Sequence, residues 1–506
     1  MEDNEYYRRL VQTLRHVALL DSIGSLLGWD ERTHLPPRGT AHRADQLGLI
    51  ARLTHEQFTS PRIDELLREV EHSTLFQSGP EDADLVVNVR ETRRLYDRAR
   101  KLPTELVEEM TRTAVLAEAA WVEARRKSDF ASFEPWLAKT LELKRREAEC
   151  VGYRSNPYDA LLDAYEPRET ADGVQRVFDS FRDRLVELVG RVTSCGRKAP
   201  VQILHRKYPT ALQQQFARDA AVAIGFDFDA GRLDVTVHPF CTGIGPGDTR
   251  LTTRYDENYF GDGFFSVLHE AGHGLYEQGL PKAEHFGLPV ADSVSLGIHE
   301  SQSRLWENFV GRSRAFWRYF FPKARDTFGD TLNDVSEDQW LWAINDIQPS
   351  LIRTEADEAT YNLHIMLRFE LEQAMLRDEL KPRDLPAAWN QRMRQYLGLT
   401  PPDDARGCLQ DIHWAGGAIG YFPTYSLGNL YAAQFFEQAH KDLGDLDGMF
   451  ARGEFAPLLN WLREKIHRHG KRYSARQLVK RVTGSDLSAD ALMRHLARKA
   501  SEYYGV

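Results

Sequence analysis

The chain has 506 residues, 28% of them charged, and a formal net charge of −10. This acidic balance argues against a basic nucleic-acid-binding surface and against a polybasic membrane anchor. The length is enough for a large hydrophobic core, in one large unit or in two or three ordinary domains.

The four cysteines are Cys150, Cys195, Cys241 and Cys408, and no two of them form a C-x-x-C pair. Such wide spacing indicates neither a disulfide framework nor a cysteine zinc site. The acidic N-terminus lacks the features of a signal peptide, and no apolar run approaches the ~20 residues that a membrane helix needs. We therefore expect a cytoplasmic protein with no membrane or nucleic-acid partner.

Helical patterns dominate the N-terminal part of the chain. Residues 5–28 have helical spacing, and breaks are predicted at Trp29-Asp30 and at 36–39. The next helix is predicted to begin at Ser60-Pro61, with Ser60 as N-cap and proline at the first helical position. Further helical patterns cover residues 81–150, interrupted at Pro103, then 168–192 and 208–223.

The period then changes from helical to alternating. Residues 232–240 and 248–255 alternate as strands do, and the glycine-rich segment 243–247 between them is typical of a turn. The pattern predicts a small antiparallel hairpin. Its open edge could hold an extended peptide through backbone hydrogen bonds, or the hairpin could be purely structural; the sequence leaves both interpretations open.

The segment after this hairpin carries an H-E-x-x-H motif. On a helix, His269 and His273 project from one face, one turn apart, where two imidazoles can bind one divalent metal. Glu270 can then reach a metal-bound water rather than the metal itself. Zinc would lower the pKa of that water towards ~7, and Glu270 would take its proton during attack on a carbonyl.

The alternative is a surface histidine pair with a solvated glutamate. The flanks 264–268 and 275–276 are largely apolar, however, and buried polar groups need partners such as a metal. Gly272 and Gly274 weaken the helix by about 1 kcal/mol each relative to alanine. They suggest that substrate or another backbone approaches this helix closely.

A catalytic zinc needs three protein ligands and an open position for water. The long H-E-x-x-H-x-x-G-x-x-H signature is absent, because Tyr276 and Gly279 stand where it requires glycine and histidine. The third ligand should therefore be a carboxylate. The candidates are Glu277, Glu284, Asp292, Glu300 and Glu307. We favour Glu300, which opens an apolar periodic run, with Glu307 as runner-up. The alternative for Glu300 is an acidic residue at a helix start that interacts favourably with the helix macrodipole.

Two later stretches have unusual composition. Arg353 is followed by three acids up to Glu358, which is typical of an ion-paired helix face but could also dock a substrate carboxylate bidentately. Residues 407–426 alternate glycine, aromatic and polar residues, as in a loop that lines a site and donates to an oxyanion. A packed aromatic loop is the alternative. Ser474–Gln477 is a predicted capping box.

Five motifs in order along the chain carry a family resemblance. They are Asp248-x-Arg250-x-Thr252, His269-Glu270-x-x-His273, His299–Arg304, Ile352-Arg353-x-x-Ala356-Asp357-Glu358 and Gly407-x-x-Gln410-Asp411-x-His413-Trp414. With them, the chain resembles the thermostable carboxypeptidase Taq family of zinc metallocarboxypeptidases over nearly its whole length. The resemblance implies a large, mostly α-helical fold with a deep substrate cleft and a small antiparallel sheet, similar to neurolysin and angiotensin-converting enzyme. We expect one peptidase domain, 1–506, with two helical lobes as a variant.

The resemblance also implies an activity. It implies a homodimer that releases single C-terminal amino acids from peptides, with broad specificity and poor action next to proline. Zinc is the expected metal, and cobalt is a possible substitute. It places His269, His273 and Glu300 on the metal and makes Glu270 the base.

The remaining site residues are also assigned by the resemblance. Substrate binding is assigned to Arg353, which would hold the terminal carboxylate, and to Asp248 and Arg250. His413, with Tyr421 or Tyr425, would stabilise the oxyanion. A carboxylate that orients the histidine ligands is expected, and Asp248, Asp357 or Glu358 could supply it.

Two other functions remain open at this point. One is a zinc oligo-endopeptidase or dipeptidyl carboxypeptidase in the same kind of fold. The other is a non-catalytic peptide-binding protein with a structural metal, against which the intact Glu270 argues, because a structural site needs no base.

Overall fold

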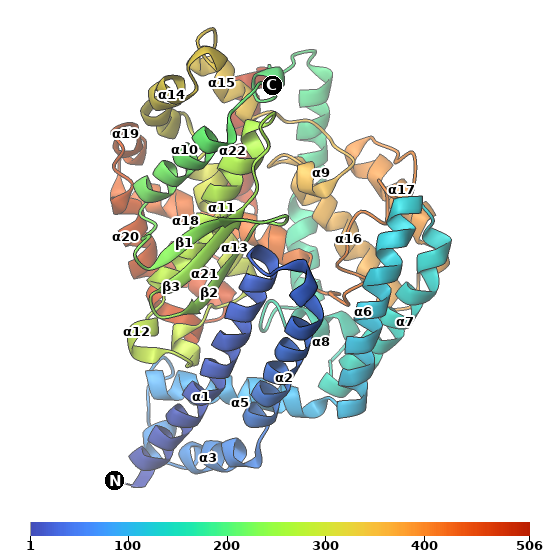
Figure 1. Cartoon of the computed structure of the whole chain (residues 1–506), viewed down its shortest axis with the longest axis vertical. Coiled ribbons are helices and arrows are strands. Elements are labelled where there is room, and N and C mark those ends of the chain that lie inside the picture. The colour runs from blue at the N-terminus through green and yellow to red at the C-terminus, as the bar shows by residue number, and fades with distance from the viewer. Residues whose placement is uncertain (1) are drawn as a thin grey trace.

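The structure, a computed structural model, describes residues 2–506 and is mostly α-helical (Figure 1). The first helices are α1 (Glu2–Thr33), α2 (Thr40–Phe58), α3 (Pro61–Glu71), α4 (Thr74–Gln77), α5 (Asp84–Lys101), α6 (Thr104–Lys127), α7 (Phe130–Val151), α8 (Pro157–Leu162), α9 (Ala171–Ser194) and α10 (Thr210–Ala223). Strands β1 (Gly231–Val235), β2 (Phe240–Gly245) and β3 (Asp248–Thr253) follow. The later helices are α11 (Phe260–Gly279), α12 (Lys282–His285), α13 (Leu296–Arg304), α14 (Arg314–Phe328), α15 (Glu337–Ile344), α16 (Thr360–Leu376), α17 (Leu385–Leu397), α18 (Pro423–Leu443), α19 (Leu446–Ala451), α20 (Ala456–Lys465), α21 (Ala475–Thr483) and α22 (Asp490–Lys499). The predicted mostly α-helical fold class with a small sheet is confirmed.

Helix ends agree with the local sequence signals in most places. Pro103 separates α5 from α6, and the capping box at Ser474 is present. Pro61 opens α3, but the Ser60 side chain makes no capping hydrogen bond. The predicted break at Trp29-Asp30 is wrong: α1 continues to Thr33, and the carbonyl oxygen of Asp30 accepts the hydrogen bonds that close the helix.

The sheet differs from the predicted antiparallel hairpin. Its order is β1-β3-β2; β1 pairs with β3 in parallel, and only β2 runs antiparallel to β3. The first predicted strand ends at Val235, and the chain returns as β2 on the other side of β3. Gly243 and Gly245, predicted in a turn, lie in β2 at a register shift. The turn is Pro246-Gly247, where Gly247 has a φ of 76°.

Aromatic packing fixes the start of α11, which follows β3. Phe260 and Phe264 lie 5.1 Å apart between ring centroids, and Phe260 lies 4.9 Å from Trp340. Trp317 lies 4.9 Å from Trp340 on the same side. Aromatic pairs at such distances contribute about 0.5–1.5 kcal/mol each beyond burial. This cluster anchors the helix that carries the H-E-x-x-H motif.

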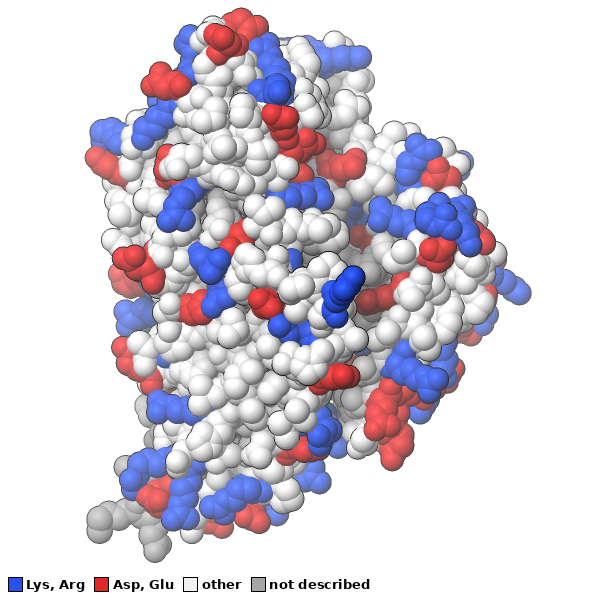
Figure 2. Space-filling view, viewed as in Figure 1, with Lys and Arg blue, Asp and Glu red and all other residues white. Residues whose placement is uncertain are grey.

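The N-terminal helices form a second, smaller core. Residues of α1, α3 and α5 pack together with Leu288 and Val290, whereas α2 packs on α1 and has no buried residue. Apolar side chains remain exposed here, including Leu19 (53% exposed) and Ile23 (47%) of α1. Figure 2 shows few charged side chains over the middle of α1, and a furrow between α2 and α6. Within the described residues, no helix is long and apolar enough to cross a membrane.

Candidate metal centre and active site

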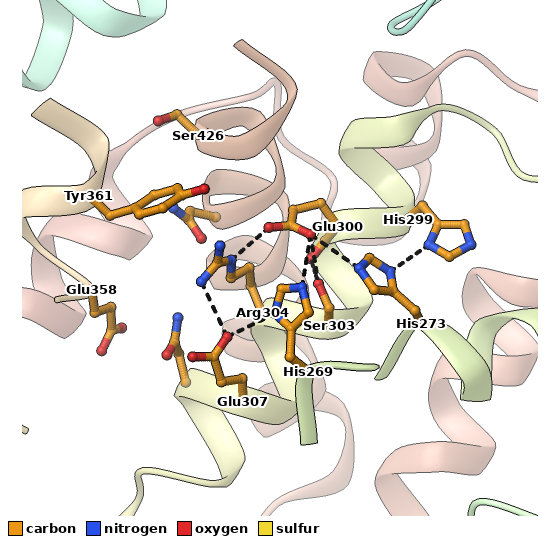
Figure 3. Close-up of polar contacts among 12 residues, drawn as sticks. His269, His273, His299, Glu300, Ser303, Arg304, Glu307, Glu358, Tyr361 and Ser426 are labelled. Carbon is orange, nitrogen blue, oxygen red and sulfur yellow. Dashed lines mark hydrogen bonds and ion pairs between the residues drawn. The ribbon is translucent and has the colours of Figure 1, made fainter. Parts of the chain in front are cut away.

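The predicted ligands come together from two helices. His269 and His273 of α11 face Glu300 of α13 (Figure 3). Glu300 Oε2 lies 3.5 Å from His269 Nε2 and 3.3 Å from His273 Nε2. All three ligand atoms lie within 4.8 Å of one another. Tetrahedral zinc with bonds of ~2.0–2.1 Å would hold its ligand atoms about 3.4 Å apart, so this donor set fits a metal of that size.

Two glycines allow this convergence. A Cβ added at Gly272 of α11 would lie 2.5 Å from the carbonyl oxygen of Gln302 in α13. A Cβ at Gly428 of α18 would lie 2.6 Å from Glu300 Cγ. Helix α13 is therefore held between α11 and α18 at distances that only glycine permits. The expected close approach at Gly272 is confirmed, and the approaching backbone is that of α13.

The second nitrogen of His269 contacts Glu307. His269 Nδ1 lies 2.9 Å from Glu307 Oε2, and Arg304 and Arg312 hold the same carboxylate. Burial opposes the charge of Glu307, but Arg304 and His269 outweigh it and lower its pKa to about 2. Glu307, the runner-up for third ligand, therefore lies on the opposite side of the ring from Glu300. An anionic partner at Nδ1 favours the tautomer that carries its proton on Nδ1. The lone pair of Nε2, on the side of Glu300, is then free to bind a metal.

The second nitrogen of His273 contacts another histidine. His273 Nδ1 lies 2.6 Å from His299 Nδ1, and His299 Nε2 lies 2.8 Å from Glu277 Oε1. Glu277 also pairs with Lys282. This series of contacts orients the His273 ring. Glu277 is therefore the partner of His299 and Lys282 rather than a metal ligand. No role was predicted for His299, although it opens the His299–Arg304 motif; its place directly before Glu300 was the available signal.

The other candidates for the third ligand and for the orienting carboxylate lie elsewhere. Asp292 pairs with Lys471. Asp357 accepts hydrogen bonds from Ala359 N and Thr360 N at the start of α16. Glu358 pairs with His495 at 2.5 Å and with Lys499. Asp248 pairs with Arg250. None of these four carboxylates contacts His269 or His273, because each is paired with another partner.

Glu270 is buried on α11 beside His269. Its side chain is 6% exposed, and burial raises its pKa to about 7. A carboxyl group with such a pKa exchanges a proton readily near neutral pH. A bound metal cation would lower this pKa again, because a nearby positive charge favours the carboxylate form that a base needs.

Arg353 does not lie on a helix face with three acids, as one sequence interpretation had it. It opens a short 3-10 turn, η6 (Arg353–Glu355), and is 5% exposed. Its Nε and Nη2 donate to Asp411 Oδ1 at 3.0 and 2.8 Å, and its Nη1 donates to Tyr361. Arg368 donates to Asp411 Oδ2 at 2.7 Å. Two guanidinium groups share one carboxylate, which leaves one positive charge uncompensated within this group.

The predicted oxyanion residues cluster next to Arg353. The ring of Tyr421 lies 5.4 Å from His413 and 5.3 Å from Tyr425, and the Arg353 guanidinium lies 5.2 Å from the Tyr425 ring. Burial, with help from Arg353, lowers the pKa of His413 to about 4, so its imidazole is neutral at pH 7. Both tyrosines therefore lie beside His413, with the Tyr425 ring 6.5 Å from it. Tyr165, which was not predicted, packs 5.3 Å from Tyr421.

Asp248 and Arg250 contact each other and α1. Their bidentate pair has two N–O distances of 2.8 Å, and the Arg250 guanidinium lies 4.2 Å from the Trp29 ring. Arg232 lies 4.9 Å from the same ring. The structure therefore gives these two residues a part in docking α1 onto the sheet, apart from the His269–Glu300 group.

Comparison with known proteins identifies the family. The model of the carboxypeptidase Taq (M32) metallopeptidase family matches residues 9–500. The chain belongs to this family. It is 49% identical to thermostable carboxypeptidase 1 of Thermus thermophilus over 99% of both chains, and 39% identical to carboxypeptidase 1 of Bacillus subtilis over the full length of both.

Solved structures of M32 carboxypeptidases have the same fold. The enzyme from Deinococcus radiodurans R1 superposes with a TM-score of 0.95 at 39% identity, over 99% of this chain and 100% of that one. Pyrococcus furiosus carboxypeptidase, in an Apo-Mg structure, gives a TM-score of 0.94 at 37% identity over 98% and 99%. Membership of the M32 family supports carboxypeptidase activity, hence hydrolysis of peptides, and implies a divalent metal.

Proposed function

We propose that this M32 member is a zinc carboxypeptidase that releases single C-terminal residues from peptides, with broad specificity and poor action next to proline. Cobalt is the alternative metal. The observation that carries the proposal is that His269, His273 and Glu300 converge on one point, with Glu270 directly after His269 on the same helix.

His269, His273 and Glu300 would hold the metal through Nε2, Nε2 and a carboxylate oxygen. When bound there, a divalent metal polarises the scissile carbonyl and makes water more acidic. Glu307 and His299 keep the two imidazoles in the tautomer and orientation that this requires. Glu270 takes the proton from the attacking water and delivers it to the leaving amine.

Arg353 would bind the terminal carboxylate of the peptide. The excess positive charge that it shares with Arg368 and Asp411 is nearly buried, and an uncompensated buried charge favours the entry of an opposite one. A guanidinium also matches a carboxylate in its fork geometry. Asp248 and Arg250 stay proposed substrate-binding residues, although their observed contacts are with each other and, for Arg250, with Trp29 of α1.

His413 and one of the two tyrosines would stabilise the oxyanion. A neutral imidazole N–H and a phenol O–H are both suitable donors to a developing negative charge. Tyr421 is the one whose pKa is affected by Glu300, besides its burial and its hydrogen bond with Tyr425. This electrostatic proximity favours Tyr421 as the donor nearer the metal.

The experiment compares one peptide with a free and with an amidated C-terminus, with and without chelator, by mass spectrometry. Stepwise loss of single residues from the free form alone, abolished by chelator and restored by zinc, supports the proposal. Internal cleavage of both forms, or release of dipeptides, would instead favour the endopeptidase or dipeptidyl carboxypeptidase function. Metal binding without any cleavage would favour a peptide-binding protein.

We further propose a cytoplasmic homodimer built from single-domain subunits. The four free cysteines suit a reducing compartment. The exposed apolar residues of α1 and α2, Leu19, Ile23, Leu26 and Leu49, form a face that a second copy could cover. Light scattering of the wild type and of Ile23→Glu tests this assembly; a monomeric wild type would exclude it.

A further inference from the structure

Glu372 of α16 is a fully buried carboxylate that receives three hydrogen bonds. Trp414 Nε1 donates to Oε1 at 2.7 Å, and Gly420 N donates to Oε2 at 3.2 Å. Tyr158 OH of α8 donates to Oε2 at 2.6 Å. The exposed fraction of the Glu372 residue is 0%. Burial of a charged or polar carboxyl group is costly, so its retention here needs an explanation beyond filling space.

Two of the three donors belong to one loop. Trp414 directly follows His413, and Gly420 directly precedes Tyr421. The backbone of Gly420 has a φ of 92°, and a Cβ there would lie 2.9 Å from Leu162 N. The loop therefore passes α8 so closely that only glycine fits. The Glu372 side chain of α16 thus accepts hydrogen bonds from both ends of the segment 414–420, which connects the two proposed oxyanion donors, His413 and Tyr421.

We infer that Glu372 is a positioning residue that sets His413 and Tyr421 for the reaction, through Trp414 and Gly420. The inference rests on the proposed function and adds a residue to it. Hydrogen bonds to the reacting carbonyl depend steeply on placement, and a displacement of about 1 Å can cost ~100-fold in rate. A carboxylate that accepts at both ends of the loop fixes this placement better than apolar packing, because each hydrogen bond has a direction.

Glu372→Gln separates positioning from packing. Glutamine has the same shape, but its amide nitrogen cannot accept a hydrogen bond. In one orientation the amide faces Gly420 N–H, and in the other it faces Trp414 N–H, so one end of the loop is released in either case. Trp414→Phe keeps an aromatic ring and removes only the N–H that reaches Glu372. Tyr158→Phe is the matched control, because it removes the third donor without touching the loop.

The assay measures kcat and KM for a free-C-terminal peptide, with metal content and melting temperature for each variant. We expect Glu372→Gln and Trp414→Phe to lower kcat by about tenfold or more, with KM within about twofold, because the loss is in the transition state. Tyr158→Phe should keep kcat within about twofold of the wild type even where its melting temperature falls.

Equal kcat in Glu372→Gln and Tyr158→Phe would overturn the inference, as would losses of kcat that follow the losses of melting temperature across all three variants. If Glu372→Gln does not fold, Trp414→Phe decides by the same criteria. The wild type is measured first: an inactive wild type contradicts the proposed function, whereas an active wild type with unaffected variants contradicts only the role of Glu372.

Discussion

Among single residues, Glu270 offers the most direct test of the chemistry. We expect Glu270→Gln to retain the metal, because the amide leaves His269, His273 and Glu300 in place. Turnover should fall by at least ~100-fold, since a general base contributes about 10²–10⁴. Metal analysis and a cleavage assay measure the two effects. Glu284→Gln, at an exposed glutamate, is the control, and activity of Glu270→Gln within tenfold of the wild type would contradict its role.

Arg353 tests how the chain distinguishes a free C-terminus. We expect Arg353→Lys to keep part of the charge and to lose the forked geometry, which lowers the preference for free over amidated peptide by about tenfold or more. Arg353→Ala should remove the preference. The ratio of kcat/KM for the two peptides is the readout, so a general loss of stability cancels. If both variants keep the wild-type ratio of kcat/KM, Arg353 has only a structural role as the partner of Asp411.

For single residues, the sequence was informative where the spacing along a helix alone determines the relative direction of two side chains. His269 and His273 are one helical turn apart, so their common direction follows from the motif, and their position beside Glu300 agrees with the prediction. The partners of their second nitrogens could not be predicted. Glu307 and His299 reach those nitrogens only because of how α13 and the segment after it cross α11, which no local pattern encodes. The metal-binding roles themselves stay predictions.

At the scale of helices, the packing of α11 on α13 leads to a stability prediction. Gly272→Ala should destabilise the protein by about 1–3 kcal/mol, because the added methyl overlaps the Gln302 and Ser303 backbone. It should also weaken metal binding by moving Glu300. Gly190→Ala, in the exposed face of α9 with nothing within 4 Å of its added Cβ, should instead stabilise by about 0.5–1 kcal/mol. Chemical denaturation measures both; equal effects would refute the close-packing argument.

Strands were harder to predict than helices for a physical reason. The alternation correctly indicated extended chain for residues 232–235, but not for 236–239, and β3 begins at Asp248 as expected. Strand direction, however, depends on where the chain goes after Val235, and that path is set by contacts such as Thr236 Oγ1 with Arg32 O of α1. Those contacts join segments far apart in sequence, so the antiparallel prediction for the first strand failed.

Over the whole molecule, buried carboxyl groups predict how stability depends on pH. Glu166 accepts hydrogen bonds from Ser295 Oγ, Gly297 N and Tyr431 OH, each at 3.0 Å, yet burial outweighs them and raises its pKa to about 7 from 4.5. Between these values the native state holds a proton that the unfolded state has released. The stability from Glu166 is therefore present below about pH 4.5 and is lost as pH rises through about 7.

We expect Glu166→Gln to flatten this dependence. The wild-type free energy of unfolding, measured relative to the variant, should fall between pH 5 and pH 8 by up to about 3 kcal/mol, from ~1.4 kcal/mol for each unit of pKa shift. Urea denaturation at constant chelator concentration gives both curves. Parallel curves would mean that Glu166 is ionised throughout, and that its three donors outweigh burial.

The segment directly after α13 is a π-helix, η4 (Leu305–Val310). Such a turn holds one residue more than an α-helical turn and commonly arises as a single inserted residue. Removing one residue would rotate Glu307 by about 100° relative to Glu300, so the two carboxylates could no longer meet opposite nitrogens of His269. In evolutionary terms, this segment should tolerate substitutions at its outward positions but no change in length. Insertions and deletions among relatives should therefore accumulate in surface loops and spare residues 300–307.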